Sequence, residues 1–234
     1  MRPEAEMPGA VTPLKALCSD EAQDRWSHLY RQIAESLEES FGMRGRAVLR
    51  EGVRQYAALL GREKRAFLEK CGLKTSLKTA ANLRGPFPVG VRTDKEWIEH
   101  TEQQLFVNIV RCPHAELWNQ REKRHLGQLW CEEFYPAYFH SAIGDAVQIN
   151  MTRVLTNPGD EHCRFSVYLR PANLDLPDRK RCFDGYDPDR KPVLEVPEPE
   201  IDFEQRRRLL FSCIKDELRR SLDKTLEDIV NVDL

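Results

Sequence analysis

Apolar residues that recur at steps of three and four predict two amphipathic helices near the start of the chain. We expect the first over residues 20–41 and the second over residues 46–71. The two apolar stripes comprise Trp26, Tyr30, Ile33, Leu37 and Phe41, and then Leu49, Val53, Tyr56, Leu60, Phe67 and Cys71. Gly42 and Gly72 follow the two runs, and glycine commonly ends a helix. Both stripes therefore need a partner surface in the fold.

The pattern changes to short alternating segments after residues 85–88. Strands are predicted over 89–100 and 104–111, and again over 146–155 and 162–169, because branched and aromatic residues lie between turn-forming residues. A helix over 121–139 separates these two pairs. The order predicts an α+β fold, in which two hairpins form an antiparallel sheet around a central helix. The amphipathic N-terminal helices and a C-terminal helix would flank this unit.

We assign residues 19–170 to this α+β unit and expect three further segments outside it. Residues 1–18 carry three prolines and no sustained period, which is typical of a flexible leader. Residues 171–200 are rich in proline and aspartate and predict an irregular arm on the surface. Residues 201–234 predict a last helix from about residue 202. Its apolar stripe comprises Phe211, Ile214, Leu218, Leu222, Leu226 and Ile229. This stripe can pack within its own chain, or it can cover a second subunit and form a homo-oligomer.

The composition excludes several classes of partner. The 36 basic and 38 acidic side chains leave a net charge of −2, so no overall field would attract nucleic acid or an anionic membrane. No apolar run approaches the ~20 residues that cross a bilayer, and the first residues lack the pattern of a secretory signal. The seven cysteines occur singly in a chain of 234 residues, which favours reduced thiols and a cytoplasmic location.

The most informative residues are Cys112, Pro113 and His114, which directly follow the strand predicted over 104–111. Proline fixes the backbone next to the thiol, so the thiol is expected at a rigid junction between a strand and a loop. If the His114 imidazole lies close in space, it can remove the thiol proton and yield a nucleophilic thiolate. The alternative is structural, with Cys112 as a small buried apolar residue and His114 as a solvated loop residue.

Cys131 lies inside the central helix, one turn from Gly127 and one turn from Tyr135. The three residues therefore share a face, on which the glycine leaves room either for a ligand or for ordinary core packing. Glu132 and Glu133 diverge by ~100° around the helix, so at most one of them readily shares a site with Cys131.

The second hairpin contributes a third cysteine, Cys163, just after a turn at residues 157–160. Asp160 can bind its own turn, and His162 and Cys163 must point to opposite faces of the strand. Cys112, His114, Cys131 and Cys163 are zinc-ligand types, but no close pair such as C-x2-C occurs, so no metal is predicted. The phosphate-loop and dinucleotide motifs are also absent, and no cofactor is expected.

Several of these residues belong to motifs that together resemble one family. The motifs are Val110–Trp118 (VRCPHAELW), Gly127–Cys131 (GQLWC), Thr152–Thr156 (TRVLT) and Gly159–Phe165 (GDEHCRF). This ordered set of three single cysteines is similar to the L-2-amino-thiazoline-4-carboxylic acid hydrolase family, over roughly residues 45–169. The chain departs from the family where it carries Tyr135 in place of an aspartate, which moves any carboxylate role to Glu132 or Glu133.

The resemblance implies a hydrolase that opens a C–N bond of a small cyclic amidine-like substrate through cysteine chemistry. Cys112 would be the nucleophile and His114 the general base, with Cys131, Glu132 and Cys163 as further candidates in the catalytic site. The candidate substrate-binding residues are Gly127, Tyr135, Asp160 and the arginines Arg111, Arg153 and Arg164, one of which would bind a substrate carboxylate. The alternative is a non-catalytic module that senses a small molecule or zinc, with its pocket between the sheet and the central helix.

Overall fold

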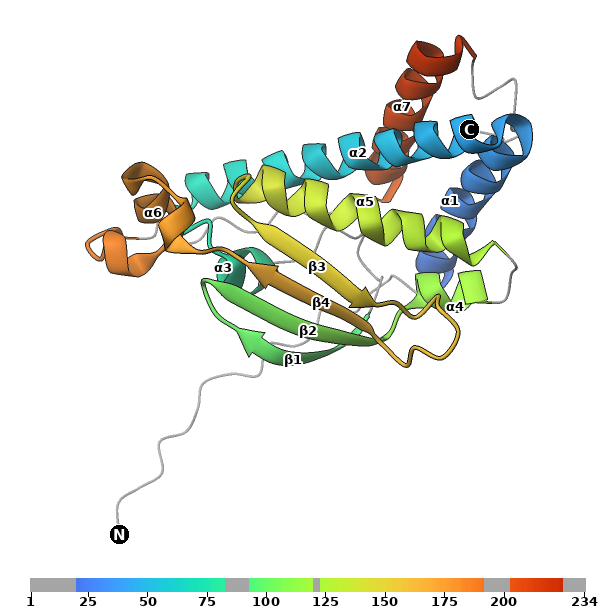
Figure 1. Cartoon of the computed structure of the whole chain (residues 1–234). Helices are drawn as coiled ribbons and strands as arrows, with labels where there is room; N and C mark the ends of the chain where they lie inside the picture. The colour runs from blue at the N-terminus through green and yellow to red at the C-terminus, as the bar shows by residue number, and fades with distance from the viewer. Residues whose placement is uncertain (1–19, 83–92, 120–122, 192–202, 225–234) are drawn as a thin grey trace.

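The computed structural model describes residues 20–82, 93–119, 123–191 and 203–224, which form an α+β fold (Figure 1). The helices are α1 (Asp20–Phe41), α2 (Met43–Lys70), α3 (Leu77–Asn82), α4 (Pro113–Asn119), α5 (Arg124–Ala142), α6 (Leu176–Cys182) and α7 (Phe203–Leu222). The strands are β1 (Asp94–His100), β2 (Gln104–Arg111), β3 (Gln148–Arg153) and β4 (Cys163–Tyr168). None of the described helices has the length and apolar character needed to span a membrane.

The four strands form one antiparallel sheet in the order β1-β2-β4-β3, as the two predicted hairpins require. The hairpins meet through their second strands, with Ile109 opposite Cys163 and Val107 opposite Phe165. In β4 every second residue is buried, so Cys163, Phe165 and Val167 face the helices. The sheet is therefore buried on one face, which is common for antiparallel sheets.

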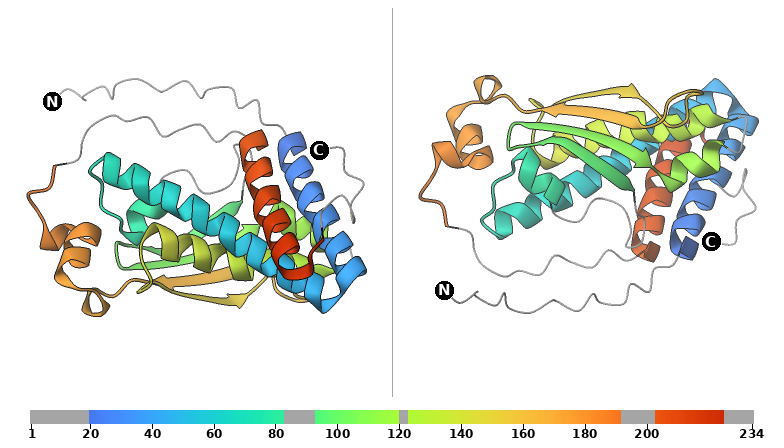
Figure 2. Two further views of the ribbon diagram at one scale, coloured as in Figure 1. Left: turned by 90° about the horizontal axis from the view of Figure 1, so that it is seen from above. Right: turned by 90° about the horizontal axis from the view of Figure 1, so that it is seen from below.

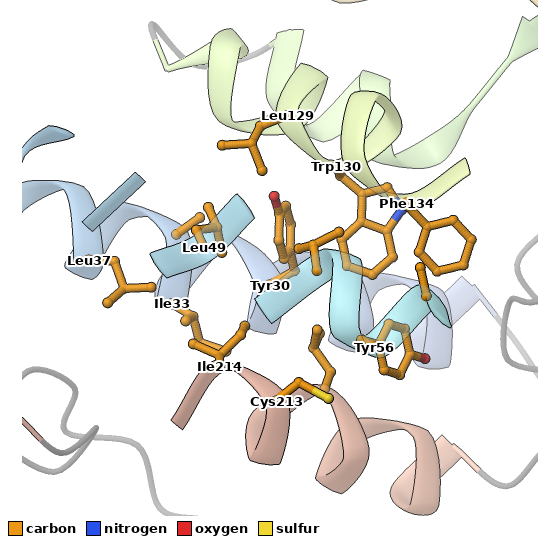
Figure 3. Packing of buried hydrophobic residues seen from close by; sticks show 14 of the residues in the cluster. Tyr30, Ile33, Leu37, Leu49, Tyr56, Leu129, Trp130, Phe134, Cys213 and Ile214 are labelled. Carbon is orange, nitrogen blue, oxygen red and sulfur yellow. The ribbon is translucent and has the colours of Figure 1, made fainter. Parts of the chain in front are cut away.

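Helix α5 lies between this face of the sheet and the long helix α2 (Figures 1 and 2). The α2 side is close-packed around aromatic side chains, among them Tyr30, Tyr56, Trp130 and Phe134 (Figure 3). Gly61 allows this approach, because a Cβ atom there would collide with the backbone oxygen of Tyr138. The α2–α5 interface is the main core of the molecule.

The last helix packs within its own chain, which favours the first of the two predicted arrangements. Leu210, Ile214 and Leu218 of α7 are fully buried in the cluster that α1 and α2 also form. The approach is close, because a Cβ atom on Gly52 of α2 would lie 2.7 Å from the Ile214 side chain. Figure 2 shows α7 lying across α2 beside α1. Leu226 and Ile229 lie outside the described residues.

The first two helices and the four strands are confirmed, and Gly42 and Gly72 have the positive φ angles that helix ends favour. Part of the first strand, 89–92, and residues 1–18 lie outside the described residues. The prediction of an irregular arm over 171–200 is wrong for residues 176–182, which form α6. The sequence pattern missed this helix because its buried apolar residues, Cys182 and Phe183, lie only at its C-terminal end and show no helical repeat. Helices α3 and α4 were likewise not predicted.

Candidate active site

Cys112 lies between the end of β2 and the start of α4, so the predicted strand-to-loop junction is a strand-to-helix junction. Its backbone oxygen accepts the Glu116 N–H at 3.0 Å, which closes the first turn of α4. Proline suits the first position of a helix, where its missing N–H costs nothing. The thiol accepts hydrogen bonds from the backbone N–H groups of His114 and Ala115. The local sequence thus holds the sulfur above two amide donors.

The fold brings the three predicted cysteines together. Cys131 of α5 and Cys163 of β4 lie close enough to Cys112 that a negative charge on Cys112 would raise the pKa of each. Together with His114 and Tyr135 they line an apolar cavity of about 30 Å³ beneath α5. The Cys163 sulfur also accepts the Leu155 N–H at 3.2 Å. Cysteines separated by twenty and fifty residues in the chain therefore share one site.

All three thiols are held in their neutral form, since burial in an apolar environment disfavours a thiolate. Burial raises the pKa of Cys112 and Cys131, and it raises that of Cys163 to about 11. Opposing influences are most numerous at Cys112, where two backbone amides and the Lys95 ammonium lower the pKa of the thiol, whereas one backbone amide does so at Cys163. Cys112 is thus the thiol with the best-prepared surroundings for a negative charge.

Lys95 is the functional candidate that the sequence analysis missed. It lies on β1 opposite Ile109, and its ammonium is near enough to Cys112 for each to influence the other's pKa. The only signal in the sequence was a cation at an alternating position of the first hairpin. The pairing of β1 with β2 was predicted, but the register shifts within β1, which decide that Lys95 lies opposite Ile109 near Cys112, could not be derived from the pattern.

His114 is buried rather than solvated, and its ring stacks on Trp130 with 6.2 Å between the ring centroids. This burial lowers the pKa of the imidazole to about 4. The ring is therefore neutral at physiological pH, and burial makes it a weaker base than a solvated imidazole. The part of the structural alternative that placed His114 in solvent is wrong.

A polar pocket of about 240 Å³ adjoins Cys131 on the side of β3. Its lining includes Gln128, Glu132 and Pro136 of α5, and Met151, Thr152, Arg153 and Asn157 of β3 and the following loop. Glu132 accepts a hydrogen bond from Gln128 at 2.8 Å and pairs with Arg50 at 3.4 Å. This pocket lies between the sheet and the central helix, where the non-catalytic alternative placed one.

The two glutamates diverge as predicted. Glu133 is 6% exposed and forms ion pairs with Arg50 and Arg54 of α2, one of them at 2.6 Å. It stabilises the α2–α5 interface, whereas Glu132 and Cys131 share the polar pocket. Glu132 is therefore the carboxylate available to a ligand.

Of the other predicted residues, Gly127 lines the thiol cavity and leaves room there for the Trp118 indole, with which a Cβ atom would collide. Asp160 accepts the Val154 N–H at 3.1 Å and so orders its own turn. Arg111 is exposed and pairs with Glu116 at 2.8 Å, away from the cavities, and Arg164 bonds to Asn108 at 3.1 Å.

Arg153 is the predicted arginine that lines the polar pocket. Among the described residues, no three His, Cys, Asp or Glu side chains are arranged to hold a metal ion. Cys112, His114, Cys131 and Cys163 are all described, so this geometry does not assemble the four-ligand zinc set considered above.

The fold and the site together define an α+β protein with a thiol-lined cavity and an adjacent polar pocket for a small molecule. A family model described as L-2-amino-thiazoline-4-carboxylic acid hydrolase matches residues 25–167, and the chain belongs to this family. The match includes most of α1, which the resemblance over 45–169 left out. The family name indicates a hydrolase. A search of curated proteins and a search of solved structures found no match.

Proposed function

We propose that the protein hydrolyses a C–N bond of a small cyclic amidine-like substrate, with Cys112 as the nucleophile. The observation that carries this proposal is the surroundings of the Cys112 sulfur, where two backbone amides and a lysine favour the thiolate. Family membership supports the reaction class. A 2-amino-thiazoline carboxylate is the substrate type that the family name suggests.

The thiol is activated when the substrate binds. A protonated cyclic isothiourea carries a positive charge, and a cation beside a thiol favours its ionised form. The neutral His114 imidazole accepts the thiol proton as the general base. Activation in this order explains why the thiol stays neutral in the unliganded protein, where burial raises the pKa of Cys112.

In the first step the Cys112 sulfur bonds to the carbon between the ring sulfur and the ring nitrogen. The bond from this carbon to the ring nitrogen then breaks, and the nitrogen leaves as an amine after it takes a proton from the imidazolium. Water next adds to the same carbon, and the Cys112 thiolate leaves. The net reaction adds one water molecule to the substrate. A 2-amino-thiazoline-4-carboxylate would give an S-carbamoyl amino acid.

The polar pocket binds the charged end of the substrate in this proposal. Arg153 forms a bidentate pair with the substrate carboxylate, which matches the geometry of a guanidinium group. Glu132 accepts a hydrogen bond from the amidine nitrogen, and Tyr135 closes the opposite side of the reacting carbon. Cys131 and Cys163 form the wall of the cavity behind Cys112. The cytoplasm is the proposed location, because the reaction needs a reduced thiol.

The direct test is turnover of 2-amino-thiazoline-4-carboxylate by the purified protein, with acid-quenched samples digested and analysed by peptide mass spectrometry. We expect release of the ring-opened product and an adduct on the peptide that carries Cys112. A Cys213→Ser variant is the matched control, because that thiol lies in the α2–α7 core. Turnover without any adduct on Cys112 would remove the nucleophile assignment, and no turnover of any cyclic amidine would overturn the proposed function.

A further inference from the structure

A third cavity, of about 90 Å³, lies on the other side of Tyr135 from the thiols. The sheet, α5 and α3 line it, and among the described residues its walls are apolar apart from Lys95 and the hydroxyl-bearing Tyr135 and Tyr138. Leu105, Val107 and Val167 line it from the strands, and Ala80 and Ala81 from α3. Neither the family match nor the proposed catalytic residues account for this cavity.

The cavity contrasts with the rest of the interior. Protein interiors are close-packed, with few voids larger than a water molecule. A cavity lined by apolar side chains does not hold water well, because water there lacks hydrogen-bond partners. Trp97, which is 41% exposed, stands at its wall on the edge strand β1. The cavity is therefore a place where an apolar group from outside can be buried.

The cavity is joined to the proposed reaction centre through shared walls. Tyr135 lines both this cavity and the one that holds Cys112, while Phe165 and Ile149 lie between it and the polar pocket. Cys131 and Tyr135 are one helical turn apart on α5, so the three cavities follow one face of a single helix. A molecule whose reacting carbon lies at Cys112 would thus have Arg153 on one side and this cavity on the other, beyond the Tyr135 side chain.

We propose that this cavity binds an aliphatic side chain of the substrate, so that the substrate class is an alkyl-substituted cyclic amidine rather than the unsubstituted ring. The proposal rests on the proposed function, because it places the reacting carbon at Cys112. An apolar cavity of ~150 Å³ accommodates benzene. A cavity of about 90 Å³ therefore suits a branched chain of roughly three or four carbons.

Lys95 fits this assignment as the cation among the described residues of the wall. Its pKa is lowered because neighbouring protein atoms replace part of its water, and a negative charge on the nearby Cys112 sulfur opposes this effect. An aliphatic chain in the cavity removes further water around the Lys95 ammonium. Filling the cavity thus strengthens the attraction between the ammonium and the thiolate.

The test measures equilibrium binding of simple amidines by calorimetry, which needs no turnover. The probes are acetamidine, propionamidine, butyramidine and 3-methylbutyramidine. Each added methylene should tighten binding about fourfold, which corresponds to ~0.8 kcal/mol for each buried CH₂ group. Ala81→Leu fills the cavity and should remove this dependence on chain length while acetamidine still binds.

Ser166→Leu is the matched control, because Ser166 lies between Phe165 and Val167 on the opposite face of β4. This variant should keep the full chain-length dependence. Ala81→Val, which adds less volume, serves if Ala81→Leu does not fold, and it should reduce the gain in affinity from 3-methylbutyramidine.

An affinity that does not change with chain length, no binding of any amidine, or an equal loss of chain-length dependence in Ser166→Leu would overturn the proposal. If affinity does not change with chain length but the unsubstituted ring is turned over, only the proposal of an alkyl side chain is rejected. If affinity rises with chain length but no cyclic amidine is turned over, the cavity still binds alkyl chains and the hydrolase function is rejected.

Discussion

Helix α5 has two faces that differ sharply in packing. Leu129 and Phe134 lie in the close-packed aromatic core with α2, and Phe134 is 0% exposed. Cys131 and Tyr135 face the sheet, where three cavities separate the helix from the strands. Both faces follow the same helical period, and each carries a glutamate among its apolar residues, Glu133 on the α2 side and Glu132 in the polar pocket. The packing therefore distinguishes the stabilising face from the binding face more clearly than the residue types do.

The difference follows from what covers each face. Glycines and small residues let α2 approach α5 closely, as Gly61 does beside Tyr138. A twisted sheet cannot follow a helix so closely, and pockets form readily where the two diverge. Substitutions on the α2 side should therefore change stability, and those on the sheet side should change binding and chemistry.

Replacing Cys112 with Ser should give the largest effect of all. A serine hydroxyl is a far weaker nucleophile than a thiolate, so turnover should fall by at least about 10³-fold. The melting temperature should stay nearly unchanged, because the substitution preserves shape at a half-buried position. Steady-state kinetics and thermal melts check both parts. Retained activity would contradict the nucleophile role, and loss of the fold would favour a structural role for Cys112.

Replacing His114 with Asn should lower the rate by about 10²- to 10⁴-fold, the range for loss of a general base. The wild-type protein should keep its protonation state at His114 down to about pH 5, because burial lowers the pKa of the imidazole to about 4. An acid limb of kcat/KM near pH 4 is therefore expected. An acid limb at pH 6.5, or a full-rate Asn variant, would remove His114 from the mechanism.

Replacing Phe134 with Ala should act on stability rather than on catalysis. Loss of a fully buried phenylalanine costs ~3–5 kcal/mol of unfolding free energy, because it leaves a cavity in a close-packed core. Denaturant unfolding measures the loss, and the fraction that remains folded should still react at Cys112. A loss below about 1 kcal/mol would show that the α2 side of α5 is not the main core.

The stability should fall in acid because of His114. The unfolded chain binds a proton near pH 6.5, whereas burial holds the pKa of the folded imidazole at about 4. The unfolded state thus carries more protons between these values, and the unfolding free energy decreases as the pH falls from 6.5 to 4, by up to about 3 kcal/mol. Denaturation curves across this range measure it. His114→Asn should remove this contribution, and an unchanged slope in that variant would assign the dependence to other groups.

Replacing Lys95 with Met should have the smallest effect. Removal of the positive charge raises the pKa of the Cys112 thiol, because the ammonium favours the thiolate. Alkylation of Cys112 by iodoacetamide at neutral pH should slow by roughly threefold, since water screens an exposed lysine. Lys95→Arg retains the charge and should keep the wild-type rate. Equal rates in the Met variant would show that Lys95 does not act on Cys112.

The elements that the sequence predicted well are those with a sustained period. The apolar residues from Trp26 to Phe41 repeat over about four turns, and the strands over 104–111 and 162–169 lie between turn-forming residues, so local pattern was enough. Helix α4 was missed because its seven residues carry too little periodicity, and α6 because Pro177 and Asp178 are residue types typical of loops. For the same reason the burial of His114 could not be anticipated.

The residues of the candidate site also fall into two groups, those that the sequence could select and those that only the tertiary structure placed. Cys112, Cys131 and Cys163 could be selected from the sequence because a thiol beside proline, a helical thiol and a thiol after a turn are each distinctive. The sequence also determined that Glu132 and Glu133 diverge, since 3.6 residues per turn fix that angle. Only the tertiary structure decided which glutamate lies beside Cys131, which arginine lines the pocket and that Lys95 acts on Cys112. These placements depend on the order of the strands and on which element packs against each face of a helix. Both are set by contacts between residues far apart in the chain, and no local period encodes such contacts.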